Sequence, residues 1–322
     1  MEKLKIGEWT FGLGKERKLT ENQIYSLEEF VEKWGRIETE IRKGDPTTIA
    51  AVREFGVPTI LCRVDMAPFN AGEEIDKKVY EVEARPAGLG VMTKISPGFV
   101  ENLKAMWKPL KSVGTIVLPS RDTAKDDTLI FSKAMGWQWI KISSLGPLSP
   151  YLWVRGGKTD KKMIDSLNLE ERALAPVTAH GDKTYLLKMG LATLVKDIHQ
   201  LSIMESFVVK PLYGSKARKI LIYYPLMPGY PGVYRWNTIR KILEEKKEER
   251  FIVQPFILPA REKMKIRINK AKRPGGFVIW RLFFAYDFND EQWRFVGGAW
   301  NWRPSLLVHG APDAVFGSLR VD

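Results

Sequence analysis

Three acidic side chains early in the chain have the types and spacing of a cation site. Glu81 and Glu83 lie two residues apart in an apolar run, so on a β-strand they project from the same face. Asp65 ends the apolar run 59–65, which a hairpin would bring beside them. Carboxylates this close together need protons or cations, and their hard oxygen atoms suit Mg²⁺. The alternative is an ordinary edge strand whose wet face pairs both glutamates with Lys or Arg.

Lys210 and the turn after it have the chemistry of an anion site. The lysine ends the apolar run 206–210, and the turn that follows contains Gly214 and Ser215. Small side chains let backbone amides approach an anion, and a lysine beside them can neutralise phosphate. The alternative is a solvated lysine at the end of a strand.

Two later segments could complete such a site. Gln254, Phe256 and Ile257 end an apolar run, so they form either one wall of a flat aromatic pocket or ordinary core. Arg281 lies in a strongly apolar run, where an unpaired charge would be costly, and this favours a functional role. The alternative is an ion pair with a surface acid such as Asp287.

In this order, the segments resemble the circularly permuted ATP-grasp family, typified by glutathionylspermidine synthase. That family takes its magnesium ligands from a motif Asp…Glu-x-Asn-x-Arg-Pro-Gly, and Asp65 with Glu81-Val-Glu83-Ala-Arg85-Pro86 looks like it. In the permuted branch the metal motif precedes the phosphate-binding lysine and the adenine hinge, which is the order found here. Glu83 departs from the family's Asn, and Lys216-Ala-Arg218 departs from its glycine-rich loop.

The resemblance implies a role for each matched residue. Lys183 follows Asp182 as at the family's entry into the nucleotide-binding module, and Arg303 follows a Gly-x-Trp segment. The implied cofactor-binding residues are Lys183, Lys210, Gly214, Ser215, Gln254, Phe256 and Ile257; the implied metal ligands are Asp65, Glu81 and Glu83; the implied catalytic residues are Arg281 and Arg303. The implied cofactors are ATP and Mg²⁺, and the implied reaction is amide formation between a carboxylate and an amine through an acyl phosphate.

The formal net charge of +13 favours anionic partners without choosing among them. We expect an anionic small-molecule or peptide substrate. The alternative is a nucleic-acid-binding protein with a degenerate or absent ATP site, in which Trp293, Trp300 and Trp302 form a stacking platform instead of core. A third reading is a phosphotransferase that stops at a phosphorylated product.

Cysteine use and hydropathy suggest the compartment. The single cysteine, Cys62, excludes an intramolecular disulfide framework and reads as a small core residue. No run approaches the roughly 20 apolar residues that span a bilayer, and the N-terminus is charged. We therefore expect a cytoplasmic protein without a membrane partner.

The elements that must position these residues predict an α+β fold with a small α/β subdomain. Helices are expected at 26–43, with Ser26 and Glu29 as a capping box, and at 46–55, 97–107, 123–135, 161–167 and 236–248. Strands are expected at 59–65, 77–84, 113–118, 138–142, 151–154, 206–210, 219–224, 251–257, 263–268, 277–286 and 293–302. The predicted units are 1–90 (N-terminal helices and metal-site hairpin), 91–172 (α/β subdomain) and 173–322 (nucleotide-binding subdomains), with an ATP-grasp-like, circularly permuted cleft between antiparallel sheets.

Overall fold

The computed structural model describes residues 3–6, 9–43, 56–84, 86–109, 115–118, 123–141, 152–154, 182–213, 220–230, 232–246, 249–263, 266–268, 271–273, 275–306 and 314–321. The helices expected at 46–55 and 161–167 lie outside these ranges, as do Arg85, Gly214 and Ser215.

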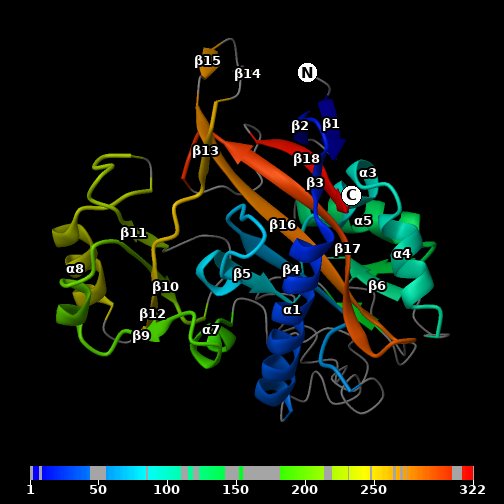
Figure 1. Cartoon of the computed structure of the whole chain (residues 1–322), viewed down its shortest axis with the longest axis horizontal. Helices are drawn as coiled ribbons and strands as arrows, with labels where there is room; N and C mark the ends of the chain where they lie inside the picture. Colours follow the sequence, from blue (N-terminus) through cyan, green and yellow to red (C-terminus); the bar gives the residue numbers. More distant parts are fainter. Residues whose placement is uncertain are drawn as a thin grey trace.

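A mixed sheet of nine described strands forms the centre of the molecule (Figure 1). Its order is β1–β2–β18–β17–β16–β4–β5, with β3 paired to β18 and β13 paired to β16. The strands are β1 (Lys3–Ile6), β2 (Trp9–Leu13), β3 (Arg17–Leu19), β4 (Leu61–Met66), β5 (Val79–Glu83), β13 (Ala260–Glu262), β16 (Gly276–Asp287), β17 (Gln292–Arg303) and β18 (Val315–Val321). Among these described strands, β18 runs parallel to β2 and β3, and the other pairs are antiparallel. The sheet therefore joins strands from both ends of the chain.

Helix α1 (Glu21–Arg42) packs on one face of this sheet. Its N-terminus is a capping box: the Thr20 hydroxyl accepts from the Gln23 amide at 3.3 Å, and Gln23 Oε1 accepts from the Thr20 amide at 2.9 Å. The predicted start at Ser26 is therefore wrong, because the buried stripe of the helix already includes Ile24. The core beneath it is rich in aromatic residues, including Phe30, Trp34, Trp280, Phe284, Trp293, Trp300 and Trp302.

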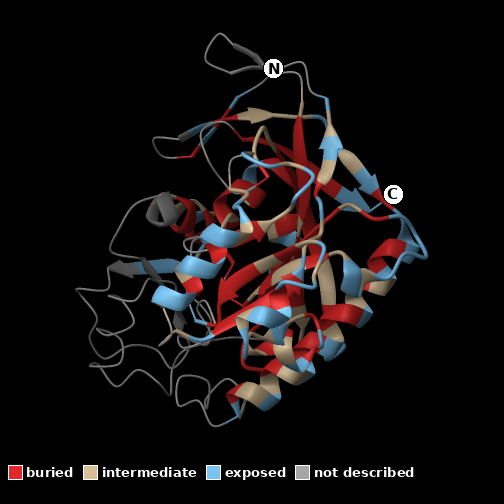
Figure 2. Ribbon diagram, turned by 90° about the vertical axis from the view of Figure 1, so that its left-hand side faces the viewer, coloured by how far each residue is buried: buried red, intermediate tan, exposed pale blue. Residues whose placement is uncertain are grey.

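Three shorter helices pack on the opposite face. They are α3 (Leu89–Ile95), α4 (Phe99–Met106) and α5 (Thr123–Met135), and their core includes Phe99, Leu103, Phe131, Phe283 and Val296. Because apolar side chains cover both faces of β16 and β17, these strands are almost wholly buried (Figure 2). Helix α5 has the predicted bounds and ends at Gly136, whose φ of 75° suits a glycine stop.

The βαβ unit expected within residues 91–172 is present, although α3, α4 and α5 from this part of the chain pack on the large sheet. Its parallel sheet has the order β7–β6–β8, with strands β6 (Thr115–Leu118), β7 (Gln138–Lys141) and β8 (Leu152–Val154). Helix α5 connects β6 to β7, as a βαβ unit requires.

A second, antiparallel sheet lies beside the β5 edge of the large one (Figure 1). Its order is β11–β10–β12–β9, with strands β9 (Thr193–Leu194), β10 (Phe207–Pro211), β11 (Leu221–Tyr223) and β12 (Phe251–Pro255). Helix α8 (Trp236–Glu245) packs on one face through Ile239 and Leu243. The short helix α7 (Thr184–Lys188) leads into this sheet, and the hairpin β14 (Ile266–Ile268)–β15 (Ala271–Arg273) follows it. Two 3₁₀ turns lie at Ile75–Lys77 and Ile198–Leu201.

Several elements differ from the expectations from sequence. Strands β1, β2, β3 and β18 and helix α3 were not expected. Strands β2 and β3 pair with β18 from the other end of the chain, and such short, distant pairings carry little local signal. No helix within the described ranges has an apolar stretch long enough to cross a lipid bilayer.

Candidate active site

One face of strands β4, β5 and β16 carries the charged residues that the sequence singled out. Asp65 lies opposite Glu81 of β5 on one side and opposite Arg281 of β16 on the other, and Arg63 lies opposite Glu83. Residues directly opposite one another in antiparallel strands have Cβ atoms about 5 Å apart and share a face. The hairpin thus brings the three predicted acids and Arg281 together.

Arg63 is the centre of this charged cluster, and the sequence interpretation missed it. Its Nε and Nη2 atoms donate to the two carboxylate oxygens of Asp65 at 2.6 and 3.0 Å, and Nη2 lies 2.9 Å from Glu83 Oε2. Burial by itself lowers the pKa of the Arg63 guanidinium, but the charges of Asp65 and Glu83 raise it above its ordinary value. The signal that could have found Arg63 is a charge inside an apolar run, two residues before an acid on the same strand face.

Arg281 is held by partners on both sides. Its Nε lies 3.6 Å from Asp65 Oδ2. With the Asn301 side-chain amide turned so that its oxygen faces Arg281, that oxygen accepts from Nη1 and Nε at 3.2 Å each. The alternative pairing with Asp287 does not occur, since Asp287 accepts from Asn289 at 2.8 Å and Arg281 faces Asp65. Burial lowers the pKa of Arg281, and the charge of Asp65 opposes that shift.

Arg303 lies farther along the same face. It is opposite Phe277 of β16, and the alternation of β17 places it on the side of Asn301. The two predicted catalytic arginines therefore share a face but not a direct cross-strand pairing.

The carboxylates fit Mg²⁺ in part. Asp65 and Glu81 are neighbouring hard-oxygen donors, which is the chemistry that Mg²⁺ prefers. As the side chains are placed, however, Arg63 holds Asp65 and Glu83, and within the described residues no three His, Cys, Asp or Glu side chains are grouped to hold one metal ion. The chemistry of Asp65 and Glu81 therefore fits the ion, but Asp65 and Glu83 would each have to loosen their ion pair with Arg63 to become ligands.

Lys210 reaches this cluster from the second sheet. Its Nζ donates to the carbonyl oxygen of Tyr80 at 2.9 Å. Tyr80 is the extra residue of a β-bulge, since Asp65 pairs with Glu81 and Met66 pairs with Val79. The carbonyl that Lys210 contacts thus lies directly beside Glu81.

Burial and charge act together on the two lysines and Glu81. Burial lowers the pKa of Lys210 to about 8, against the charge of Glu81, and it lowers that of Lys183 in the same way. Burial raises the pKa of Glu81, and the charge of Lys210 opposes this shift. Lys183 and Lys210 are only 5% and 6% exposed, so neither is an ordinary solvated side chain. Both lie at the junction of the two sheets, where Lys210 contacts β5.

The three residues predicted as the adenine hinge do not share one environment. Gln254 is buried on the face of β12 that, through the pairing with β10, also carries Lys210. Its Oε1 atom has no hydrogen-bond partner among the described residues. Phe256 packs with Phe277 and Tyr80 in a separate apolar cluster, and Ile257 is half-buried beside it in sequence.

Tyr80 contributes an unpartnered polar atom to the apolar cluster of Phe256 and Phe277. Its hydroxyl is buried without a hydrogen-bond partner among the described residues, and burial raises its pKa. The cluster also contains Ile279, Leu306, Met227, Tyr230 and Val233. An apolar wall that includes an unpartnered polar atom suits a planar ligand with polar edges.

The tryptophans predicted as core or stacking platform belong to the core. Trp293, Trp300 and Trp302 are 2%, 1% and 0% exposed and pack beneath α1. Trp300 also donates from Nε1 to the Lys15 carbonyl at 2.9 Å. These three side chains therefore offer no face on which a nucleic-acid base could stack.

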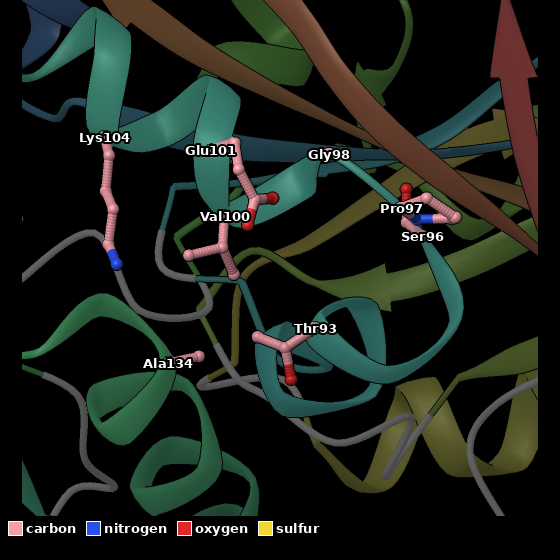
Figure 3. Close-up of a pocket in the computed structure, with 8 residues that line it drawn as sticks. All are labelled: Thr93, Ser96, Pro97, Gly98, Val100, Glu101, Lys104 and Ala134. Atoms are coloured by element: carbon pink, nitrogen blue, oxygen red, sulfur yellow. The ribbon is translucent and has the colours of Figure 1, made fainter.

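A separate hollow of about 490 Å³ lies between α3, α4 and α5 (Figure 3). Its lining is Thr93, Ser96, Pro97, Gly98, Val100, Glu101, Lys104 and Ala134. This lining includes none of the residues predicted for the active site.

Comparisons with known proteins add little to this geometry. No protein-family model matches the chain, and no curated protein matches it by sequence. Among solved structures it is similar to a D-cycloserine synthetase, with a TM-score of 0.32 and 13% identity over 56% of this chain and 90% of that one. It is also similar to a protein from Methylobacillus flagellatus assigned as a gamma-glutamylcysteine synthetase, with a TM-score of 0.43 and 10% identity over 89% of this chain and 84% of that one. Both TM-scores are below 0.5, so neither similarity establishes a shared fold or function.

Proposed function

We propose that this chain is an ATP-dependent carboxylate–amine ligase of the circularly permuted ATP-grasp type, similar to glutathionylspermidine synthase. The observation that carries the proposal is the contact between Lys210 and the Tyr80 carbonyl. It places a buried lysine from the end of one sheet beside Glu81 and Asp65 of the other, which is the meeting of phosphate and metal motifs that the proposal requires.

The second sheet supplies the nucleotide contacts in this proposal. Lys210 and Lys183 neutralise the phosphates, because both are buried cations whose charge is otherwise balanced by Glu81. Gln254, Phe256 and Ile257 line the adenine, and Gly214 and Ser215 supply the loop over the phosphates. Gln254 Oε1, buried without a hydrogen-bond partner in the described part of the chain, can accept from the adenine amino group.

The large sheet supplies the charges around the transferred group. Glu81, with Asp65 and Glu83 where their ion pairs to Arg63 open, would hold Mg²⁺, which when bound neutralises negative charge on the phosphate oxygens. Arg281 and Arg303 stabilise the developing charge on the phosphoryl and acyl phosphate groups. Arg63 belongs with them because it is a buried guanidinium in the same cluster.

The chemistry proceeds in two displacements. A substrate carboxylate oxygen attacks the γ-phosphorus and the bond to the β-phosphate oxygen breaks, which gives an acyl phosphate and ADP. An amine then attacks the acyl carbon, and inorganic phosphate leaves as the amide forms. The net charge of +13 favours an anionic small-molecule or peptide substrate for the first step.

Hydroxylamine trapping tests this proposal. The chain is incubated with ATP, Mg²⁺, hydroxylamine and a pool of amino acids, short peptides and dicarboxylic acids. The proposal expects hydroxamates and an equal amount of ADP, both lost in Lys210→Met and both retained in Arg17→Met, whose ion pair to Glu262 lies elsewhere. Release of AMP, a stable phosphorylated product without hydroxamate, or turnover unchanged in Lys210→Met would each contradict it.

A further inference from the structure

A buried group of three charges joins α1 to the turn that carries Lys183. Arg42, in the last turn of α1, donates from Nε to Glu38 Oε1 at 2.8 Å and from Nη2 to Asp182 Oδ2 at 2.7 Å. Glu38 and Arg42 are 1% and 6% exposed. The sequence interpretation gave no role to either residue.

The Asp182 carboxylate is fixed on both of its oxygens. Oδ2 accepts from Arg42, while Oδ1 accepts from the Thr184 amide at 2.9 Å and from the Thr184 hydroxyl at 2.6 Å. Arg42 therefore holds Asp182, and Asp182 holds Thr184 at the start of α7. Lys183 lies between these two fixed residues. Loss of one partner of a buried ion pair leaves the other charge buried and unpaired, so this network should respond strongly to the removal of Arg42 or Asp182.

The same turn is bonded to both sheets. The Lys183 amide donates to the Leu212 carbonyl at 3.0 Å, just after β10, the strand that carries Lys210. In α7, the Tyr185 hydroxyl accepts from the Val82 amide of β5 at 2.7 Å. Val82 lies between the two glutamates of the charged face, so α7 spans the junction where the lysines and acids meet.

We propose that Arg42 is a positioning residue of the active site: through Asp182 it fixes Lys183 and Tyr185 against β5. The inference rests on the proposed nucleotide site for its functional consequence, since Lys183 is there a phosphate contact. Its structural part stands separately, because the network predicts that Lys183 loses its fixed, covered position when the bond between Arg42 and Asp182 is removed.

Two variants remove that bond in different ways. Arg42→Met leaves the volume nearly filled but removes the guanidinium, and Asp182→Asn keeps the amide oxygen that can accept from Thr184 while it removes the charge. Arg17→Met is the matched control, because Arg17 makes a bidentate pair with Glu262 at 2.7 and 2.6 Å between β3 and β13, elsewhere on the sheet. Circular dichroism confirms that each variant folds before it is used.

The test measures acetylation rates of individual lysines in the intact chain by mass spectrometry. In wild type, Lys183 and Lys210 should react slowly, and Lys188 of α7, whose side chain is 52% exposed, should react fast. In Arg42→Met and Asp182→Asn we expect Lys183 to react at least about tenfold faster, with Lys210 and Lys188 changed less than about twofold. No change at Lys183, or an equal rise at Lys183 and Lys210, would overturn the proposal, and Arg17→Met should leave all three rates unchanged.

Nucleotide affinity supplies the functional readout. If wild type binds Mg²⁺ with the non-hydrolysable analogue adenylyl imidodiphosphate, both Arg42→Met and Asp182→Asn should weaken that affinity by about tenfold or more. The reason is that Lys183 would no longer be held where it contacts the phosphates. Unchanged affinity in both variants would overturn the positioning role. If wild type binds no nucleotide, the proposed function fails, while the acetylation rates still decide whether Arg42 positions Lys183.

Discussion

The Nζ atom of Lys210 and the carbonyl oxygen of Tyr80 form a hydrogen bond of 2.9 Å between residues 130 positions apart in the chain. It joins the end of β10 to β5, the edge strand of the large sheet. A free edge carbonyl is satisfied in this way, and the lysine is placed beside Glu81.

Replacement of Lys210 should change how stability depends on pH. The pKa of Lys210 falls from 10.5 to about 8 on folding because the side chain is buried. Between those pH values the unfolded chain binds more protons, so the stability of wild type relative to Lys210→Met should rise with pH. From about pH 8 to about pH 10 we expect a gain of about 2 kcal/mol in the difference between their free energies of unfolding. Urea unfolding at several pH values measures this difference. If the free energies of unfolding of the two proteins changed with pH in parallel, the pKa of Lys210 would not be lowered by folding.

Replacement of Asp65 should lower the free energy of unfolding more than replacement of Glu81. Asp65→Asn removes the counter-charge of Arg63 and Arg281, so we expect it to lower the free energy of unfolding by about 3 kcal/mol. Glu81→Gln should lower it by less, about 1–2 kcal/mol, because burial already disfavours the Glu81 charge and because Lys210, with its lowered pKa, can release its proton when this partner is lost. Urea unfolding near pH 7 measures both, and equal losses in the two variants would show that Glu81 is a structural ion-pair partner.

Glu81→Gln should nevertheless remove Mg²⁺-dependent ATP turnover. The carboxamide has one oxygen and no charge, so it is a much poorer ligand for a hard divalent ion. The measurement is ADP release with the acids that support turnover in wild type. ADP release by Glu81→Gln at the wild-type rate would show that Glu81 is not a ligand of Mg²⁺.

Tyr185→Phe tests the contact between α7 and β5. The change removes the hydroxyl that accepts from the Val82 amide and leaves that buried amide unpaired, which should cost about 1–3 kcal/mol. Hydrogen exchange resolved to single residues should show faster exchange at Val82 with little change at Val64, the β4 residue opposite it. Protection of Val82 equal to wild type would mean that α7 does not hold the edge strand.

Nucleic-acid binding should be weak despite the net charge. The three tryptophans predicted as a stacking platform are buried beneath α1, so they cannot add base stacking to the non-specific attraction between the net charge and phosphates. Fluorescence anisotropy with single-stranded DNA and RNA, at low and physiological salt, should show affinity that disappears at physiological salt. Tight binding there would favour the nucleic-acid reading.

Local patterns in the sequence predicted the parts of the fold that depend on local chemistry. The alternation around Glu81 and Glu83 predicted a strand with both acids on one face, and the apolar run before Asp65 predicted its hairpin partner. Gly136 marked the end of α5. In each case the signal lies within a few residues of the feature it predicts.

Features that depend on distant partners could not be predicted in the same way. The start of α1 at Thr20, not Ser26, depends on burial of the first turn against the sheet, because both segments have capping residues. Arg63 and Arg42 gave no site signal, since their roles come from partners on another strand and on a segment 140 residues away. The prediction that Lys210 lies close to the acids came from the resemblance to ATP-grasp enzymes, because the spacing of these residues in the sequence does not indicate it.

Titration calorimetry with Mg²⁺ and adenylyl imidodiphosphate measures whether Lys210 and Glu81 contact the same bound nucleotide. We predict that wild type binds the analogue, that Lys210→Met weakens binding by about 1.5–3 kcal/mol, and that Glu81→Gln removes the enhancement by Mg²⁺. Absence of binding to wild type, or equal affinity in Lys210→Met, would contradict these predictions.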